Sequence, residues 1–380
     1  MEEWKTYKIG EICESVSDTY RGKALDVVLV NTSDVYDGVC LNHTFVPNKD
    51  LKGQFKKTFK RNDILYSEIR PANRRFAFID FEPENYIAST KLMVIRCSEL
   101  VRPRYLYHYL KRQEMLDELQ ALAESRSGTF PQITFSELAL FEISLPNLAT
   151  QDKIVAAIDC FDDKIALNNR INHNLEEQAR IHFDAWCSKC MDSKPIRALS
   201  SNILDYTPNN HKKVILLNSS DVTEGRFESL PYVDNHNLKG QFKKRFKKGD
   251  ILYSEIRPRN HHYAICYFDA EDYIASTRLM VIRKNSEMIP SDALLYQYLL
   301  MPSVMEEFTS KTESRSGTFP QGNYEDLSTS EVPYSKDNSQ ISNTLEAIYG
   351  IIWNNLEENK RLMSLRDSLL PQLMTGQITC

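Results

Sequence analysis

Hydrophobic positions between residues 1 and 150 follow strand-like spacing first and helix-like spacing afterwards. Ile, Leu, Tyr and Val fill Asp63–Ile69 and Lys91–Arg96, and turn-forming residues flank these segments. Short runs of this composition are typical of β-strands. From Pro103 to Leu122 the leucines recur at close to helical spacing. The pattern predicts a domain that mixes α and β structure.

Two long helices with a narrow apolar seam are predicted, one from about Gln151 to Ser188 and one near the end of the chain. Each seam advances in alternating steps of three and four residues, which is the pattern of a coiled coil. Two asparagines stand at the centre of each seam, where they fix the register of a helix pair at some cost in stability. The first seam is Ile158, Phe161, Ile165, Asn168, Asn172, Leu175, Ala179 and His182, and the second is Leu345, Ile348, Ile352, Asn355, Asn359, Leu362, Arg366 and Leu369. Asn can meet Asn in either orientation, so these residues alone leave parallel and antiparallel pairing open. Antiparallel pairing would place two globular domains at opposite ends of a rod.

The same sequence blocks occur twice along the chain. Leu51–Lys57 returns as Leu238–Lys244, and Asp63–Pro71 returns as Asp250–Pro258, both 187 positions later. The seams repeat at that same offset, whereas Glu124–Gln132 returns 189 positions later as Glu313–Gln321. The predicted fold is therefore α+β, with two mixed α/β domains separated by two long antiparallel coiled-coil helices and an internal pseudo-twofold repeat. The predicted boundaries are 1–150 and 191–336 for the domains and 151–190 and 337–380 for the helices.

Basic residues concentrate at equivalent places in the two repeats, although the net charge of the chain is −5. Residues 51–75 and 238–262 each hold eight Lys or Arg residues against two acidic ones. Local basic stripes in an acidic protein are typical of phosphate contact, and the alternative is a solvated lysine-rich hairpin. The candidates for phosphate contact are Lys56, Lys57, Lys60, Lys243, Lys244 and Lys247. The candidates for guanine edges or phosphate are Arg70, Arg74, Arg75, Arg257 and Arg259, joined by Arg126 and Arg315 beside the Ser-Gly-Thr loops.

An internal ion pair between Glu68 and Arg70, and between Glu255 and Arg257, is the competing interpretation for those two arginines. Positions that differ between the repeats are better candidates for base discrimination than positions that are identical. Such positions are Ala72 against Arg259 and Arg74-Arg75 against His261-His262.

No catalytic centre, metal site or cofactor site is predicted. No serine, histidine or cysteine has a recognisable catalytic partner, and no phosphate-binding loop or adenine-methylation motif is present. Cys187 and Cys190 form the only tight cysteine pair, which favours two plain thiols over zinc or redox chemistry. The scattered cysteines, the absence of a long apolar run and the start of the chain indicate a cytoplasmic protein.

Several motifs, in one order along the whole chain, resemble the specificity subunit of bacterial and archaeal type I restriction-modification enzymes. They are Gly128–Ile133, Leu145-Pro146 running into Gln151–Ile154, Phe161–Asn168 with Asn172 and Leu175–Glu177, and Leu365–Gly376. The resemblance implies two target recognition domains that read the two halves of a split double-stranded DNA site. It also implies docking of two methyltransferase subunits and two motor-nuclease subunits, with all catalysis in those partners. Two positions depart from it: Ile348-Tyr-Gly-Ile351 replaces the Phe161–Lys164 stretch in the second helix, and Gly322 stands where the first repeat has Ile133.

Two other functions remain open at this level. The chain fits a recognition subunit of a methylation-only system, and it also fits a coiled-coil scaffold that binds protein through its two domains. Because the two domains are so alike, a pseudo-twofold arrangement predicts related half-sites in the form of an approximate inverted repeat.

Overall fold

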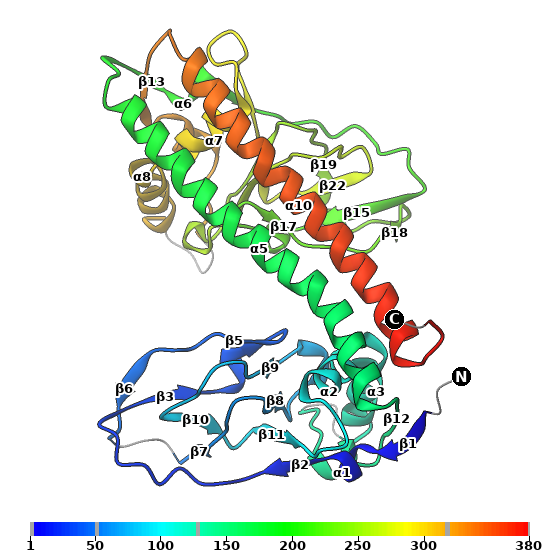
Figure 1. Cartoon of the computed structure of the whole chain (residues 1–380). Helices are drawn as coiled ribbons and strands as arrows, with labels where there is room; N and C mark the ends of the chain where they lie inside the picture. Colours follow the sequence, from blue (N-terminus) through cyan, green and yellow to red (C-terminus); the bar gives the residue numbers. More distant parts are fainter. Residues whose placement is uncertain (1–3, 50–52, 127–129, 316–319, 379–380) are drawn as a thin grey trace. The chain divides into compact units, whose positions relative to one another are not determined.

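The computed structural model describes residues 4–49, 53–126, 130–315 and 320–378, and the chain divides into two compact units. Unit 1 comprises residues 1–166 and 359–380, and unit 2 comprises residues 167–358. Each unit contains one globular α/β domain, called a head below, and a part of each of two long helices (Figure 1). None of the helices in the described ranges combines the length and the apolar character that crossing a bilayer requires.

Among the described residues, the head of unit 1 contains two four-stranded sheets and two short two-stranded ones, one of which is the antiparallel pair β4-β5. The sheet orders are β2-β11-β8-β9, β6-β3-β10-β7 and β1-β12, and only the β3–β10 pairing within them is parallel. The strands are β1 (Lys5–Lys8), β2 (Cys13–Val16), β3 (Asp26–Val30), β4 (Val35–Tyr36), β5 (Val39–Cys40), β6 (Phe45–Pro47), β7 (Phe55–Lys57), β8 (Ile64–Ser67), β9 (Phe76–Phe78), β10 (Tyr86–Ser89), β11 (Leu92–Cys97) and β12 (Glu142–Leu145). The helices are α1 (Ile9–Ile12), α2 (Pro103–Leu110), α3 (Gln113–Arg126) and α4 (Phe135–Leu138).

Strand β8 is buried along its whole length because both of its faces are covered. Successive side chains of a strand point to opposite faces. Ile64 and Tyr66 pack with α2 and α3, whereas Leu65 packs with Val28 and Ala88 of the second sheet. This explains why the predicted strand reads as a nearly continuous apolar run.

The head of unit 2 repeats this architecture strand for strand. Its sheet orders are β14-β23-β20-β21, β18-β15-β22-β19 and β13-β24, with the equivalent pair β15–β22 parallel. The strands are β13 (Asp192–Pro195), β14 (Ser200–Asn202), β15 (Lys213–Leu217), β16 (Val222–Thr223), β17 (Arg226–Phe227), β18 (Val233–Asp234), β19 (Phe242–Lys244), β20 (Ile251–Ser254), β21 (Tyr263–Ile265), β22 (Tyr273–Ser276), β23 (Leu279–Lys284) and β24 (Glu331–Tyr334). The helices are α6 (Ile196–Leu199), α7 (Asp292–Leu299), α8 (Pro302–Glu313) and α9 (Tyr324–Ser328).

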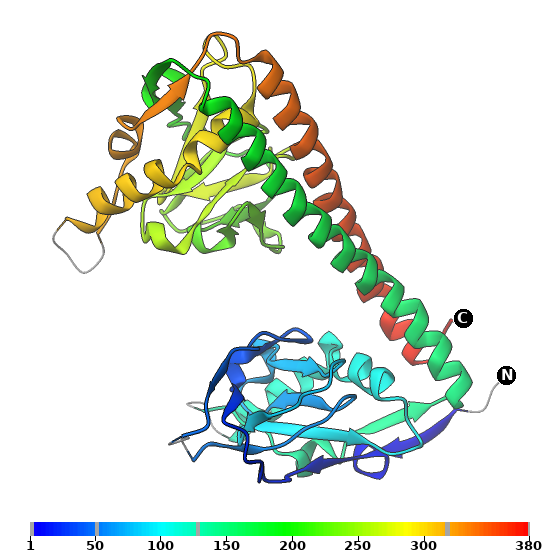
Figure 2. The same ribbon diagram turned by 60° about the vertical axis from the view of Figure 1, so that its left-hand side comes forward.

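The long helices are α5 (Leu148–Cys187) and α10 (Ser339–Met374), and within each unit they pair antiparallel. In unit 1, Ile158 of α5 shares a core with Leu370, near the end of α10. In unit 2, Phe183, near the end of α5, shares a core with Ile341, at the start of α10. Both views show the two helices side by side (Figures 1 and 2). The predicted α+β fold with antiparallel helices is confirmed.

The central asparagines make the polar contacts of the helix pair in unit 2. Asn355 Nδ2 donates to Asn172 Oδ1 over 2.7 Å, and Asn168 Nδ2 donates to a carboxylate oxygen of Glu358 over 2.7 Å. One predicted seam position is wrong, because His182 is exposed and the neighbouring Phe183 is buried in its place. The step from Ala179 to Phe183 is four residues where the seam predicts three. The buried face of α5 therefore turns toward the head there, as in a helix that packs on a domain core.

Candidate nucleic-acid interface

An arginine in a left-handed backbone conformation ends the central strand region of each head. Arg70 has φ 45° and Arg257 has φ 48°, and each precedes a proline that begins a short 3-10 turn, Pro71–Asn73 or Pro258–Asn260. A residue with a side chain adopts this conformation only at a cost of about 1 kcal/mol or more. Both arginines are exposed. The same strained turn therefore presents a cation at the surface twice.

Each arginine turn is fastened to the second repeated motif, which lies about 60 residues further along the chain. Arg70 N donates to the carbonyl of Pro131 over 3.0 Å, and Ile133 N donates to the carbonyl of Glu68 over 2.9 Å. In unit 2, Gly322 N donates to the carbonyl of Glu255 over 2.8 Å. The Ser-Glu-Ile-Arg-Pro block and the Pro-Gln block, separate in sequence, form one structure in each head. We call it the motif junction.

Side chains reinforce the motif junction in both units. In unit 1, Lys91 Nζ lies 3.2 Å from Gln132 Oε1 and 3.5 Å from a carboxylate oxygen of Glu68. In unit 2, Gln321 Nε2 donates to Glu255, and Arg278 donates to Gln321. Lys91 therefore contacts Glu68, whereas Gln321 and Lys244 contact Glu255. A cross-linked turn of this kind holds its exposed arginine in a fixed position.

The predicted phosphate-contacting lysines divide into two groups. Lys56, Lys60, Lys243 and Lys247 are exposed. Lys57 Nζ instead donates to the carbonyl of Leu92 over 2.8 Å, and its equivalent Lys244, only 3% exposed, donates to the carbonyl of Leu279 over 2.7 Å. Burial lowers the pKa of both ammonium groups. These two lysines fasten strand β7 or β19 to its own head and do not reach outward, so they leave the set of candidates for phosphate contact.

A buried aspartate–arginine ion pair holds the backbone of each of the exposed residues Lys60 and Lys247. The carboxylate of Asp63 is 1% exposed, accepts the backbone N–H of Lys60 over 2.8 Å, and is held by Arg96 through two bonds of 2.9 and 2.7 Å. Asp250 makes the same contacts with Lys247 and Arg283. In the sequence, Asp63 and Asp250 stand out only as acidic residues within the two basic windows. The repeated Asp and Arg at a fixed spacing was the signal that could have revealed the pair.

The remaining predicted arginines have internal partners. Arg74 pairs with Asp37 over 2.7 Å, and Arg75 donates to the carbonyl of Ser33 over 3.1 Å. Arg259 pairs with Glu313 over 2.7 Å, and Arg315 pairs with Asp326 over 2.7 Å. The side chain of Arg126 and most of the two Ser-Gly-Thr loops lie outside the described residues. Among positions that differ between the heads, His261 takes the place of Arg74 and lies 3.2 Å from Glu224.

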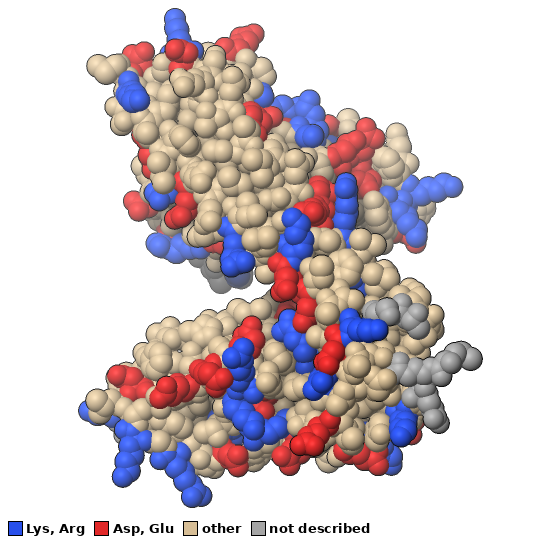
Figure 3. Space-filling model, in the orientation of Figure 1, with Lys and Arg blue, Asp and Glu red and all other residues tan. Residues whose placement is uncertain are grey.

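Charged residues on the face shown in Figure 3 are mixed in sign. Lys and Arg side chains alternate there with Asp and Glu, and wide uncharged areas separate them. This mixture agrees with a chain whose overall charge is close to balanced. On this face an anionic partner would therefore meet scattered cations and not a broad basic surface.

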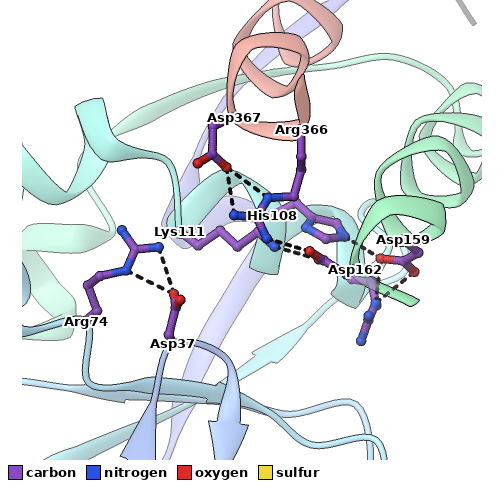
Figure 4. A network of polar contacts seen from close by, with 9 residues as sticks. Asp37, Arg74, His108, Lys111, Asp159, Asp162, Arg366 and Asp367 are labelled. Atoms are coloured by element: carbon purple, nitrogen blue, oxygen red, sulfur yellow. Dashed lines mark hydrogen bonds and ion pairs between the residues drawn. The ribbon is translucent and has the colours of Figure 1, made fainter. Parts of the chain in front are cut away.

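A network of ion pairs joins the head of unit 1 to its two helix segments (Figure 4). Asp162 of α5 accepts from Lys111 Nζ over 2.9 Å and from Arg366 of α10 over 2.6 Å. Asp159 of α5 accepts from His108 Nε2 over 2.7 Å and from Arg104 over 2.8 Å. We call this network the ionic joint.

The ionic joint sets the protonation states of its members. Burial lowers the pKa of His108 to about 4, although its hydrogen bond to Asp159 acts in the opposite direction. Burial acts to raise the pKa of Asp162, but Lys111 and Arg366 hold it below its ordinary value. His108 is therefore neutral at pH 7, and its Nε2 carries the proton because a carboxylate only accepts.

The ionic joint also contains a cluster with metal-ligand chemistry. Ligand atoms of His108, Asp159 and Asp162 lie within 4.8 Å of one another. Three cations, Arg104, Lys111 and Arg366, already neutralise the two carboxylates. A metal ion would have to displace these cations, so the cluster fits a structural joint and does not fit a metal site.

The equivalent joint in unit 2 is aromatic. Tyr349 occupies the place of Asp162, and its hydroxyl accepts from Gln297 Nε2 over 2.7 Å. Gln297 itself occupies the place of His108. The rings of Tyr296, Tyr349 and Trp353 contact one another with centroid separations of 5.6 and 5.9 Å. We call this arrangement the aromatic joint.

Cys187 and Cys190 are not joined in a disulfide. Burial raises the pKa of the Cys187 thiol to about 12, and burial also raises the pKa of Cys190. A thiol in this state is a poor nucleophile at neutral pH, which disfavours the redox interpretation of this pair.

The fold is that of a known class of solved structures, the S subunits of type I restriction-modification systems. The structure superposes on a crystal structure of a type I restriction-modification system S subunit from M. genitalium with a TM-score of 0.52, at 14% sequence identity, over 98% of this chain and 96% of that one. This likeness concerns the fold alone.

Sequence comparison finds similarity to specificity subunits over part of the chain. Residues 1–177 match the type I restriction modification DNA specificity domain. A segment of 207 residues is 42% identical to the type I restriction enzyme HindI specificity subunit of Haemophilus influenzae, covering 54% of this chain and 44% of that protein. The chain thus spans less than half the length of that relative in the match. The chain is similar in sequence to type I restriction-modification specificity subunits, in agreement with the resemblance found in its motifs.

Proposed function

We propose that this chain is the DNA-recognition subunit of a type I restriction-modification complex and that it has no catalytic role of its own. Each head reads one half of a split double-stranded site. The observation that carries the proposal is the motif junction, which holds an exposed arginine on a strained turn at equivalent places in both heads. Strained backbone that is cross-linked from several sides is characteristic of functional sites.

The cations of each head are assigned different tasks. Lys56, Lys60, Lys243 and Lys247 neutralise phosphates, which supplies affinity without sequence information. Arg70 and Arg257 stand on rigid turns, and a guanidinium in a fixed position can recognise a guanine edge through two hydrogen bonds. Arg74, Arg75, Arg259 and Arg315 would exchange their partners within the head for DNA.

The long helices are the proposed docking surface for the partner subunits. Leu167 and Ile171 of α5 are 43% and 37% exposed, and Ile351 of α10 is 49% exposed. Leu167 and Ile171 are four residues apart, so they lie on one face of α5. Exposed apolar side chains in such a row are typical of helix-in-groove contacts. We assign this face to methyltransferase subunits, and through them to motor-nuclease subunits.

DNA binding is tested with the purified chain, alone and with its methyltransferase partner, on random duplexes over a range of salt concentrations. Lys56→Ala/Lys60→Ala is expected to weaken binding to all sequences and to reduce the salt slope by about 2, since each lost phosphate contact removes about 0.9. Lys57→Met is the matched control, because Lys57 bonds a backbone carbonyl; it should leave the salt slope unchanged. Absence of binding to any duplex, even with the partner, would favour the coiled-coil scaffold.

The recognised sequence is tested by methylome sequencing of the host with and without this gene. We expect loss of one split motif whose two halves are related, because the two heads present the same motif junction. Two unrelated half-sites would contradict the relation between the halves but not the recognition role. Methylation without restriction of unmodified phage would identify a methylation-only system.

Partner docking is tested separately from DNA binding. Leu167→Lys/Ile171→Lys should abolish co-purification with the methyltransferase subunit and leave the chain's own unfolding transition in place, because both side chains are on the surface. Lys56→Ala/Lys60→Ala should weaken DNA binding and leave co-purification with the methyltransferase subunit unchanged. Retained co-purification in the helix variant would remove this face from the proposed interface.

A further inference from the structure

Unit 2 contains a cavity of about 520 Å³ between its head and its two helix segments. Its walls are mainly apolar, and Tyr263, Tyr296, Tyr349 and Trp353 are among the side chains that line them. Cavities of a few hundred cubic ångströms with apolar walls and a few polar groups are the usual form of small-ligand sites. DNA recognition as proposed above makes no use of this cavity.

The equivalent place in unit 1 holds a pocket of only about 90 Å³. Lys111 and Arg366, two long side chains of the ionic joint, line this pocket and narrow it. Lys111, Asp162 and Arg366 of unit 1 correspond in the repeat to Leu300, Tyr349 and Ala179 of unit 2. Above all, the guanidinium stem of Arg366 has only a methyl group as its counterpart. The cavity is therefore a property of one repeat and not a requirement of the fold.

The charges around the cavity favour a cation. Glu176, Glu177, Asp184 and Glu224 line it against Arg180 and Arg226, which leaves an excess of two negative charges. Arg226 is paired with Glu176 over 3.0 Å. Aromatic faces attract cations, because the ring carries its negative charge above and below its plane. The excess of carboxylates and the aromatic rings therefore both favour a cationic ligand.

A hydroxyl at the cavity wall supplies a second, independent observation. Tyr296 as a residue is 4% exposed and lines the cavity, and its hydroxyl is not one of the fully buried polar atoms and forms no hydrogen bond with any described residue. Its oxygen is free to accept a hydrogen bond from a ligand that enters the cavity.

We propose that this cavity binds a primary alkylammonium ion, with its apolar chain against the aromatic rings and its –NH₃⁺ group bonded to the Tyr296 hydroxyl. The proposal does not depend on DNA recognition. An ammonium group offers three donors and a positive charge, which match the phenol oxygen and the excess of carboxylates. A carboxylate ligand would meet repulsion from the same groups, and a neutral alcohol would gain only the apolar part.

The test is calorimetric titration of the full chain with three probes of one size: hexylammonium, 1-hexanol and hexanoate. We expect hexylammonium to bind about ten-fold more tightly than 1-hexanol, the scale of a desolvated cation–π contact, and hexanoate not to bind. Equal affinities for the amine and the alcohol would overturn the proposal, and so would no binding of the amine.

Two variants assign the binding to this cavity. Ala179→Arg/Leu300→Lys/Tyr349→Asp installs the residues of unit 1 and should abolish hexylammonium binding. Should that variant fail to fold, Glu177→Gln/Glu224→Gln changes only surface carboxylates and should weaken hexylammonium about three- to ten-fold with no effect on 1-hexanol. Unchanged amine binding in a folded variant would contradict the assignment. Loss of methyltransferase co-purification in the filled variant, without amine binding in the parent, would identify a protein-docking site instead and overturn the proposal.

Discussion

The two units join head to helices at equivalent places with opposite chemistry. Unit 1 uses Asp162 between Lys111 and Arg366, and unit 2 uses Tyr349 beside Tyr296 and Trp353. The sheets, the helices and the order of their connections are the same in both. The fold therefore tolerates either kind of joint. It does not require a particular kind of interaction.

The difference has an energetic consequence. Taking charges out of water costs several kcal/mol per ion, so an intact buried ion pair contributes little net stability, whereas a broken one is strongly destabilising. Burial of aromatic rings stabilises in proportion to area, and loss of one hydroxyl costs little. The ionic joint should consequently be the more sensitive of the two to single changes and to pH.

The largest expected effect comes from neutralising the centre of the ionic joint. Asp162→Asn keeps the shape of the side chain but leaves Lys111, which is 8% exposed, without its counter-charge and leaves Arg366 with Asp367 alone. We expect unit 1 to lose about 3–5 kcal/mol of stability. Hydrogen exchange resolved by mass spectrometry measures this in unit 1 and uses unit 2 as the internal reference. A loss below about 1 kcal/mol would mean that water already screens the pair.

Acid should destabilise unit 1 before it destabilises unit 2. The folded-state pKa of His108, about 4, lies below its ordinary value of 6.5. The unfolded chain therefore binds more protons between these values, and stability present above pH 6.5 is lost as the pH falls toward 4. The loss is about 3 kcal/mol for this group.

Urea unfolding between pH 4 and pH 7, with pulse labelling to assign each transition to a unit, measures this loss. His108→Gln is the matched control, because Gln297 occupies the equivalent place in unit 2. In that variant the pH dependence of unit 1 should flatten toward that of unit 2. An unchanged slope would assign the acid sensitivity to other groups.

A smaller effect is expected from a lysine that the two heads share. Lys244→Met removes the donor to the Leu279 carbonyl and should cost unit 2 about 1–3 kcal/mol, the penalty of a buried acceptor without a partner. Lys57→Met should cost unit 1 less, because Lys57 is only half-buried. Thermal unfolding of the two variants gives the order, and a larger loss for Lys57→Met would reverse the comparison.

The smallest effect belongs to the aromatic joint. Tyr349→Phe removes one hydroxyl and leaves the Gln297 amide without that acceptor, at a cost of about 1 kcal/mol. Measured by the same hydrogen exchange as Asp162→Asn, it should be several-fold weaker. Equal losses in the two variants would show that the chemistry of the joint does not matter.

The repeat and the two long helices could be predicted from the sequence. These features depend on local pattern and on identical blocks. The change from Phe161–Lys164 to Ile348–Ile351 was also visible, but only as a departure from a motif. Its meaning required Lys111 and Arg366, which meet Asp162 from distant parts of the chain.

The roles of individual cations could not be predicted from composition. Lys56 and Lys57 are neighbours in sequence, yet strand alternation points one outward and the other to the Leu92 carbonyl. The internal partners of Arg74 and Arg259, Asp37 and Glu313, are 37 and 54 residues away from them in sequence. Which lysine or arginine is exposed depends on sheet register and on such distant partners. Neither of these can be read from a short segment of the sequence.

The left-handed backbone at Arg70 and Arg257 has one further consequence. Glycine adopts this conformation without steric cost, so Arg70→Gly relaxes the turn that arginine strains. The backbone strain that the arginine side chain causes at this position therefore acts against folding, which is not the case at most surface positions. The variant should be at least as stable as the parent while it lacks the cation, so a defect it shows in DNA binding would belong to the lost guanidinium and not to a damaged head.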